Sequence, residues 1–202
     1  MTWLLIITGF GTGFLVGLTG VGGGALMTPL LMLLFGLAPQ TAVGTDLWFA
    51  SFTKIAASKV MFNKDLIDWQ ITKLLWYGSI PATIVTLFWL SYISAGHKDT
   101  MFIKQLIAAA ILWAGIGLIF QPILQNLTIK SEVAQDISGI QGEVITIVAG
   151  AIIGILVTLT SVGAGALGTV VLLYLYPARL NPSRLIATEV AHAIPVAYIG
   201  SY

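Results

Sequence analysis

The chain has 202 residues and a formal net charge of +1, with 57% hydrophobic residues, 8% charged residues and no cysteine. A soluble domain carries roughly 25% charged residues, so this chain cannot cover its surface with polar side chains in water. We therefore predict an all-α membrane protein, a polytopic helical bundle surrounded by lipid. The missing cysteines exclude disulfides and thiolate metal sites, and the scattered Lys and Arg residues give no stripe for nucleic acid.

A glycine tract, Gly20 to Gly24, interrupts the first apolar run. Backbone that leaves helical geometry at membrane depth is tolerated only where protein or a water-lined cavity surrounds it. Residues Thr2 to Leu18 precede the tract, and Leu26 to Leu37 would follow it as a helix about 18 Å long. Because that length is short of the ~30 Å hydrocarbon core, we predict either a re-entrant pair or one ordinary and one short helix.

Further apolar runs predict single membrane spans over residues 43–62, 74–93 and 101–120. We expect a turn from Gly36 to Thr41 around Pro39, a charged loop over residues 63–73, and a kink at Pro81. Residues 125–142 form the longest polar stretch. The chain is therefore divided into a first repeat of residues 1–122, a cytoplasmic linker of residues 123–142 and a second repeat of residues 143–202.

The second half of the chain repeats the first. Residues Thr160 to Leu167 align with Thr19 to Leu26 at a constant offset of 141 residues. The matches at an offset of 143 residues are Pro39 with Pro182, Thr45 with Thr188, and Asp46 with Glu189. A threonine and an acid that recur six residues after a proline, downstream of matching tracts, indicate internal duplication.

The charged loops predict the orientation in the membrane. The basic loop from Lys59 to Lys73 should face the cytoplasm, because positive residues are retained on that side. Three single spans separate the Pro39 turn from the second glycine unit, so the two turns should lie on opposite sides of the membrane. The Pro39 turn should lie outside, and the Pro182 turn, with Arg179 and Arg184, should face the cytoplasm. This odd number of crossings predicts an inverted-topology repeat, the architecture of many secondary transporters. The second repeat would be incomplete, with roughly sixty further residues needed for symmetry.

The tract and the threonine-acid pairs recur with a set of prolines and glycines. The motifs are Gly20 to Gly24, Pro29, the turn from Gly36 to Pro39, Gly44 to Asp46, Thr188 with Glu189, and Ala191 to Pro195. Together they resemble the TauE/SafE family of membrane permeases. The resemblance implies a multi-pass protein of the cell membrane that moves sulfur-containing anions such as sulfite or sulfonates. The chain departs from the family pattern at Gly163 to Gly165, where a fuller glycine run is usual, and at Glu189, where aspartate is usual.

The glycine tracts predict a substrate site. Helices that begin after each tract would direct free N–H groups and a positive dipole end toward the membrane middle, where they could hold an anion. Alternatively, the glycines only allow close helix packing, and each threonine bonds its own helix carbonyl. The predicted substrate-binding residues are Thr19, Gly20, Gly22, Gly23, Gly24, Thr28, Thr160, Gly163, Gly165 and Thr169, supported by Thr45, Thr188, Pro29, Pro39 and Pro182.

Three titratable residues are candidates for proton coupling. Asp46 and Glu189 could carry protons, since burial disfavours a charged carboxylate; alternatively, each acid only caps the first turn of its helix. His192 shares a helix face with Glu189 and could relay a proton or only hydrogen-bond a neighbouring helix. Lys54 is expected to extend to the cytoplasmic membrane surface, rather than to attract substrate or pair with an acid.

These inferences predict a secondary transporter that moves a small anion by alternating access, with protons as the candidate coupling ion. A passive anion channel through the same site is the first alternative. An intramembrane enzyme and a non-transporting membrane subunit are further alternatives, and the sequence offers no Gly-x-Ser-x-Gly motif for the former. No cofactor or metal is predicted, because Glu189-x-x-His192, half of a di-iron helix motif, has no second copy.

Overall fold

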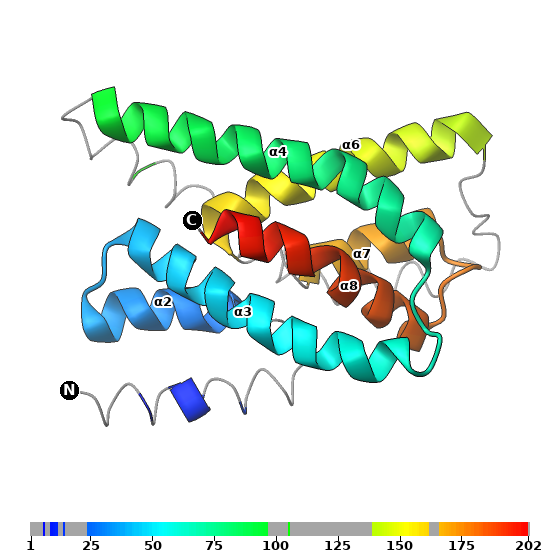
Figure 1. Ribbon diagram of the computed structural model, residues 1–202, viewed down its shortest axis with the longest axis horizontal. Helices are drawn as coiled ribbons and strands as arrows, with labels where there is room; N and C mark the ends of the chain where they lie inside the picture. The colour runs from blue at the N-terminus through cyan, green and yellow to red at the C-terminus, as the bar shows by residue number, and fades with distance from the viewer. Residues whose placement is uncertain are drawn as a thin grey trace.

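The computed structural model describes residues 6, 9–11, 14, 24–96, 105, 139–161 and 166–201. The regular secondary structure in these ranges is helical, without a strand, and short non-helical connections join the helices. The helices are α2 (Gly24–Phe35), α3 (Pro39–Phe62), α4 (Trp69–Gly96), α6 (Gly139–Thr160), α7 (Ala166–Leu175) and α8 (Pro182–Gly200) (Figure 1). The all-α class predicted from composition is therefore confirmed for the described part of the chain.

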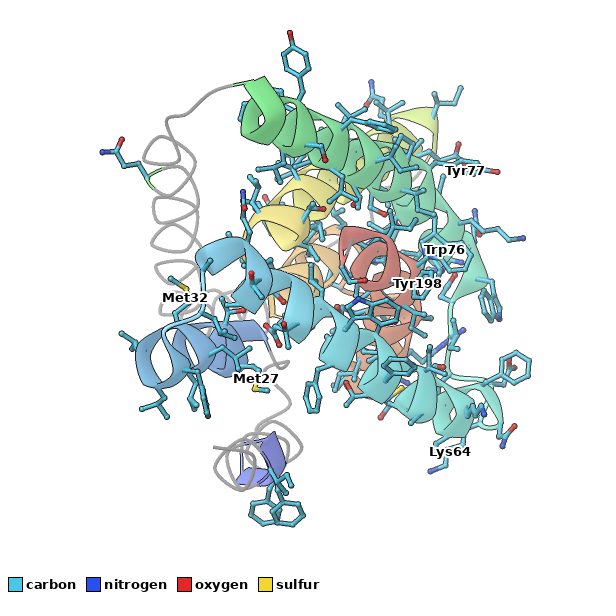
Figure 2. All side chains as sticks on the ribbon, turned by 60° about the vertical axis from the view of Figure 1, so that its left-hand side comes forward. Met27, Met32, Lys64, Trp76, Tyr77 and Tyr198 are labelled. Carbon is cyan, nitrogen blue, oxygen red and sulfur yellow. The ribbon has the colours of Figure 1, made fainter. Side chains whose placement is uncertain are left out.

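Two of the described helices are long and apolar enough to cross a bilayer. They are Trp69–Tyr92 within α4 and Gly139–Thr160, which is α6, with mean hydropathies of 1.4 and 2.2. Large side chains on their outer faces are exposed, including Phe88 at 72%, Val148 at 53% and Tyr77, which projects away from the bundle in Figure 2. Apolar surface is unfavourable in water, so these faces suit contact with lipid.

Glycines allow α4 and α6 to pack backbone against backbone. A Cβ atom added to Gly78 of α4 would overlap the carbonyl oxygen of Ile147. One added to Gly150 or Gly154 of α6 would lie 2.5 Å from a backbone carbonyl oxygen of α4, closer than real Cβ atoms come. Small residues four apart produce this close approach between membrane helices, and any larger residue would push α4 and α6 apart.

The two short helices, α2 and α7, run in opposite directions from the middle of the molecule. In Figure 1, α2 leads to the left and the chain returns through α3, whereas α7 leads to the right and the chain returns through α8. With 12 and 10 residues, neither helix exceeds about 18 Å. The preceding tract residues 20–23 and 162–165 lie outside the described ranges, so the glycine-broken helices and the inverted repeat stay predictions.

The apolar core lies where helices from both halves meet. One buried cluster joins α3, α6 and α8, and a second joins α4 and α7 with the start of α8. The first contains Val43, Leu47, Ile153, Val157, Ala193, Val196 and Ala197, and the second contains Ile71, Leu75, Leu172, Leu175, Tyr176, Leu180 and Leu185. Because each cluster draws on both halves, the two predicted repeats share one interior.

The helices begin a few residues earlier than predicted. Pro39 opens α3 instead of lying inside a turn, and its fixed φ suits the first helical position. Helix α4 begins at Trp69, so Lys73 is helical, and α6 begins at Gly139 within the predicted polar stretch. Hydropathy marks only the segment inside lipid, whereas a helix continues into the polar interface. Pro81 lies inside α4 as predicted, and residues 101–120 lie outside the described ranges except for residue 105.

Two connections lie at the same end of the bundle. Arg179, between α7 and α8, donates from Nε to Asp68 Oδ2 at 2.7 Å and from Nη2 to Asp68 Oδ1 at 3.0 Å. Asp68 belongs to the connection between α3 and α4, which also carries Lys64 (Figure 2). The cytoplasmic location of both connections stays a prediction from the positive-inside bias, and their direct contact shows that they lie at the same end of the bundle.

Candidate functional site

Four ionisable side chains are buried in the apolar interior between α3 and α8. Asp46 and Lys54 on α3 are 0% and 9% exposed, and Glu189 and His192 on α8 are 4% and 1% exposed. Removing a charge from water costs several kcal/mol unless the charge is paired or neutralised. Their burial therefore requires a specific set of partners, which differs for each residue.

Asp46 faces α2 and the end of α6. Thr28 Oγ1 on α2 donates a hydrogen bond of 2.8 Å to Asp46 Oδ2. Ser161, directly after α6, lies beside the same carboxyl group. Asp46 Oδ1 and Ser161 Oγ are both buried, and neither bonds to any other group within the described ranges. Asp46 therefore depends on hydroxyl groups for its polar contacts, because no cation from the described residues pairs with it.

Asp46 also brings together segments that flank the two glycine tracts. Thr28 follows the first tract by four residues, and Ser161 immediately precedes residues 162–165. Ser161 is not among the predicted site residues, although it aligns with Gly20 at the offset of 141 residues. The φ of Ser161, 57°, lies in the left-handed region that favours glycine. Its alignment with Gly20 was therefore the sequence signal that could have identified this position.

Lys54 and Glu189 form a buried ion pair between α3 and α8. The Lys54 ammonium lies 3.3 Å from Glu189 Oε1 and 3.2 Å from Oε2. The two side chains are 11% and 5% exposed. The expectation that Lys54 extends to the membrane surface is therefore wrong, and the alternative of pairing with an acid is confirmed. Pairing prevails because Glu189 would otherwise be an uncompensated buried charge.

The first turn of α7 packs against Glu189. A Cβ atom added to Gly168, the third residue of α7, would lie 2.9 Å from Glu189 Cγ. Asp46 is held in a comparable way by Thr28, the fifth residue of α2. Each of the matched acids thus faces the N-terminal part of a short helix, the end that carries a positive partial charge.

His192 bonds to α4 through both its ring and its backbone. Its Nε2 atom lies 2.9 Å from Ser79 Oγ, and its carbonyl oxygen accepts a hydrogen bond of 3.1 Å from Trp76 Nε1. The predicted hydrogen bond to a neighbouring helix is therefore present. These contacts fix α8 against α4, one turn beyond Glu189.

The acids do not cap their helices, so the capping interpretation is wrong. Asp46 and Glu189 are each the eighth residue of a helix that a proline opens. The N-cap positions belong to Ala38, which makes no side-chain cap, and to Asn181, whose side chain accepts from the Arg184 N–H. The prolines start both helices two turns ahead of the acids, which moves the acids from the helix ends into the interior.

The other predicted site residues have separate roles or fall outside the described ranges. Thr45 and Thr160 donate hydrogen bonds of 2.7 Å to carbonyl oxygens one turn earlier in their own helices. Thr188 accepts a hydrogen bond of 3.0 Å from the Asp68 N–H. Gly24 opens α2, Pro29 lies within it, Pro182 opens α8, and Thr169 is half-buried in α7. The residues outside the described ranges are Thr19, Gly20, Gly22, Gly23, Gly163 and Gly165.

The apolar outer faces of α4 and α6 and the carboxyl groups buried between helices place this protein in the class of helical membrane proteins. Ionisable residues inside such bundles are costly to bury. In this protein, Asp46 and the Lys54–Glu189 pair are buried in this way.

The chain belongs to the TauE/SafE family. The family model described as "Sulfite exporter TauE/SafE" matches residues 5–202. The chain is 34% identical over 194 residues to the probable membrane transporter protein YjnA of Bacillus subtilis (strain 168), a match that covers 96% of this chain and 75% of the relative. It is 35% identical over 77 residues to the probable membrane transporter protein YunE of the same strain, covering 36% of this chain and 28% of that protein. No solved structure matches.

These comparisons confirm the family predicted from the glycine tract and the threonine-acid pairs. With the apolar helices, they make the protein a membrane transporter, or permease, of the cell membrane.

Proposed function

We propose that this protein is a secondary transporter that moves small sulfur-containing anions, such as sulfite or sulfonates, by proton-coupled alternating access. The observation that carries the proposal is that both matched acids are buried against the beginnings of the short helices α2 and α7. The family description, which names a sulfite exporter, supports the sulfur-containing substrate class.

The helix beginnings supply what an anion needs. Free N–H groups and the positive end of the helix dipole favour negative charge. Both short helices start toward the middle of the molecule in Figure 1. The buried Lys54 ammonium lies near the start of α7, because its partner Glu189 packs against Gly168. An anion beside Lys54 would therefore meet one full positive charge and the partial positive charge at the start of α7.

Charge balance supports proton coupling. The region already holds the carboxyl groups of Asp46 and Glu189 against the single ammonium of Lys54. Adding an anion increases the buried negative charge, which is costly without compensation. A proton bound by one of the acids offsets that charge. Both acids are buried where they can take up that proton.

Two features support alternating access. First, α2 and α7 leave the centre in opposite directions (Figure 1), as expected if one half moves against the other. Second, the Lys54–Glu189 pair joins residues that are 135 positions apart, so it links the two halves directly. Movement of α3 relative to α8 would alter this contact and the surroundings of the substrate together.

Uphill flux tests the proposal. The protein is reconstituted into liposomes, and uptake of sulfite, thiosulfate and short alkyl sulfonates is measured with and without an imposed pH gradient. We expect the pH gradient to drive at least one of these anions above its equilibrium concentration. Flux that only dissipates gradients would identify a passive channel instead. Flux of carboxylates without any sulfur-containing anion would reject the substrate class.

A further inference from the structure

We propose that the transported anion and the Glu189 carboxylate compete for Lys54, and that Glu189 releases Lys54 by taking up a proton. This inference rests on the proposed function, because it assigns the exchange to an anion transporter. It identifies Lys54 as the cation that binds the substrate, and it identifies the step that couples anion binding to proton uptake.

The geometry of the pair suits exchange. Charge-assisted N–H···O contacts are typically about 2.7–2.9 Å long. The Lys54 ammonium instead lies 3.2 and 3.3 Å from the two Glu189 oxygens. The Arg179–Asp68 pair at the end of the bundle is closer, with contacts of 2.7 and 3.0 Å. The contacts between Lys54 and Glu189 are therefore longer than typical charge-assisted contacts, and a small anion can supply an equivalent partner.

Glu189 has one cationic partner among the described residues, and that partner is Lys54. The other titratable side chains on the elements packed against α8 are Asp46 and Lys59 on α3, Asp68 before α4, Lys73, Tyr77 and Tyr92 on α4, Glu143 on α6, and Tyr174 on α7. Asp68 is engaged by Arg179. On α8 itself, the ring of His192 is bonded to Ser79. If Lys54 turns to another anion, a proton is the available means of neutralising Glu189.

The local packing allows a neutral Glu189 to stay in place. The side chain lies against Gly168, where a Cβ atom would come within 2.9 Å of Glu189 Cγ. A protonated carboxyl group is uncharged and can remain in an apolar interior at a far lower cost than a carboxylate. Glu189 therefore does not need to reach water when Lys54 is taken.

The exchange balances in atoms and charge. One anion X⁻ and one proton enter; the Lys54–Glu189 contact breaks, a Lys54–X⁻ contact forms, and the proton becomes the O–H of Glu189. The charge of the site is unchanged for a monovalent anion. Anion and proton therefore bind together, one for one. It follows that anion affinity should fall about tenfold for each unit of pH increase, wherever free Glu189 is ionised.

The test is anion binding to the purified protein, measured with methanesulfonate and ethanesulfonate between about pH 5.5 and about pH 8. Alkyl sulfonates stay monovalent in that interval, so the slope reports the protein. The wild type should show the tenfold loss per pH unit over the part of the interval in which free Glu189 is ionised. Glu189→Gln should bind the anion at least as tightly as the wild type does at low pH, and its affinity should not vary with pH.

Lys54→Met should lose anion binding at every pH. Because this change leaves Glu189 buried without its cation, the double variant Lys54→Met/Glu189→Gln is measured as well; it should fold and still fail to bind. Lys59→Gln removes the same charge from an exposed position of α3 and serves as the matched control. It should keep the affinity and the pH slope of the wild type.

Two results would overturn the exchange. One is a Glu189→Gln variant that keeps the pH slope of the wild type, and the other is binding of the probes by the folded double variant. Either result leaves the proposed transporter intact if the wild type still binds and moves sulfur-containing anions. Absence of binding and flux in the wild type would instead count against the proposed function.

Discussion

The stability of the buried ion pair between Lys54 and Glu189 can be predicted from the structure. At a separation of 3.2 Å, two unit charges attract by about 5 kcal/mol at an effective dielectric constant of about 20. The side chains are 11% and 5% exposed, so water screens them little. Removing one partner of such a pair costs about 3–5 kcal/mol, whereas replacing both with neutral side chains is often close to neutral.

A double-mutant cycle measures this coupling without reference to transport. The variants are Lys54→Met, Glu189→Gln and their combination, and the free energy of unfolding is measured in detergent micelles at neutral pH. Each single variant should lose about 3 kcal/mol, and the double variant should regain most of that loss. Additive effects, with a coupling below about 0.5 kcal/mol, would show that the two side chains do not interact in the folded protein.

Three further predictions concern other contacts. Gly154→Val should destabilise the bundle by about 1–3 kcal/mol, because its first added atom would lie 2.5 Å from a backbone oxygen of α4. Thermal unfolding checks this, with Gly9→Ala as the control, because a Cβ atom at Gly9 would meet no atom of the described residues within 4 Å. Glu189→Gln should abolish pH-driven accumulation in liposomes while exchange of anion for anion continues, and undiminished accumulation would rule out Glu189 as the coupling residue. Arg179→Gln should cost about 1–3 kcal/mol, because it leaves the Asp68 carboxylate, whose side chain is 5% exposed, without its cation, and an unchanged free energy of unfolding would contradict that estimate.

The amino-acid sequence alone determined the class of the protein. The scarcity of charges forces lipid to be the solvent, and this conclusion does not depend on how the helices pack. The sequence also identified the family and matched Asp46 with Glu189, because prolines and glycines punctuate the backbone locally. Both acids prove to be the eighth residue of a helix opened by a proline, a correspondence visible in the spacing.

Only the tertiary structure decided which polar groups meet. The partner of Lys54 lies 135 residues away, and nothing in the pattern around Lys54 distinguishes a lysine that reaches the membrane surface from one that turns inward. Likewise, Ser161 acquires its place beside Asp46 from the way α6 ends against α3. Local sequence specifies helices and their apolar faces, but the contacts between faces depend on how the helices cross. In this bundle the glycines of α4 and α6 control one crossing through close backbone packing.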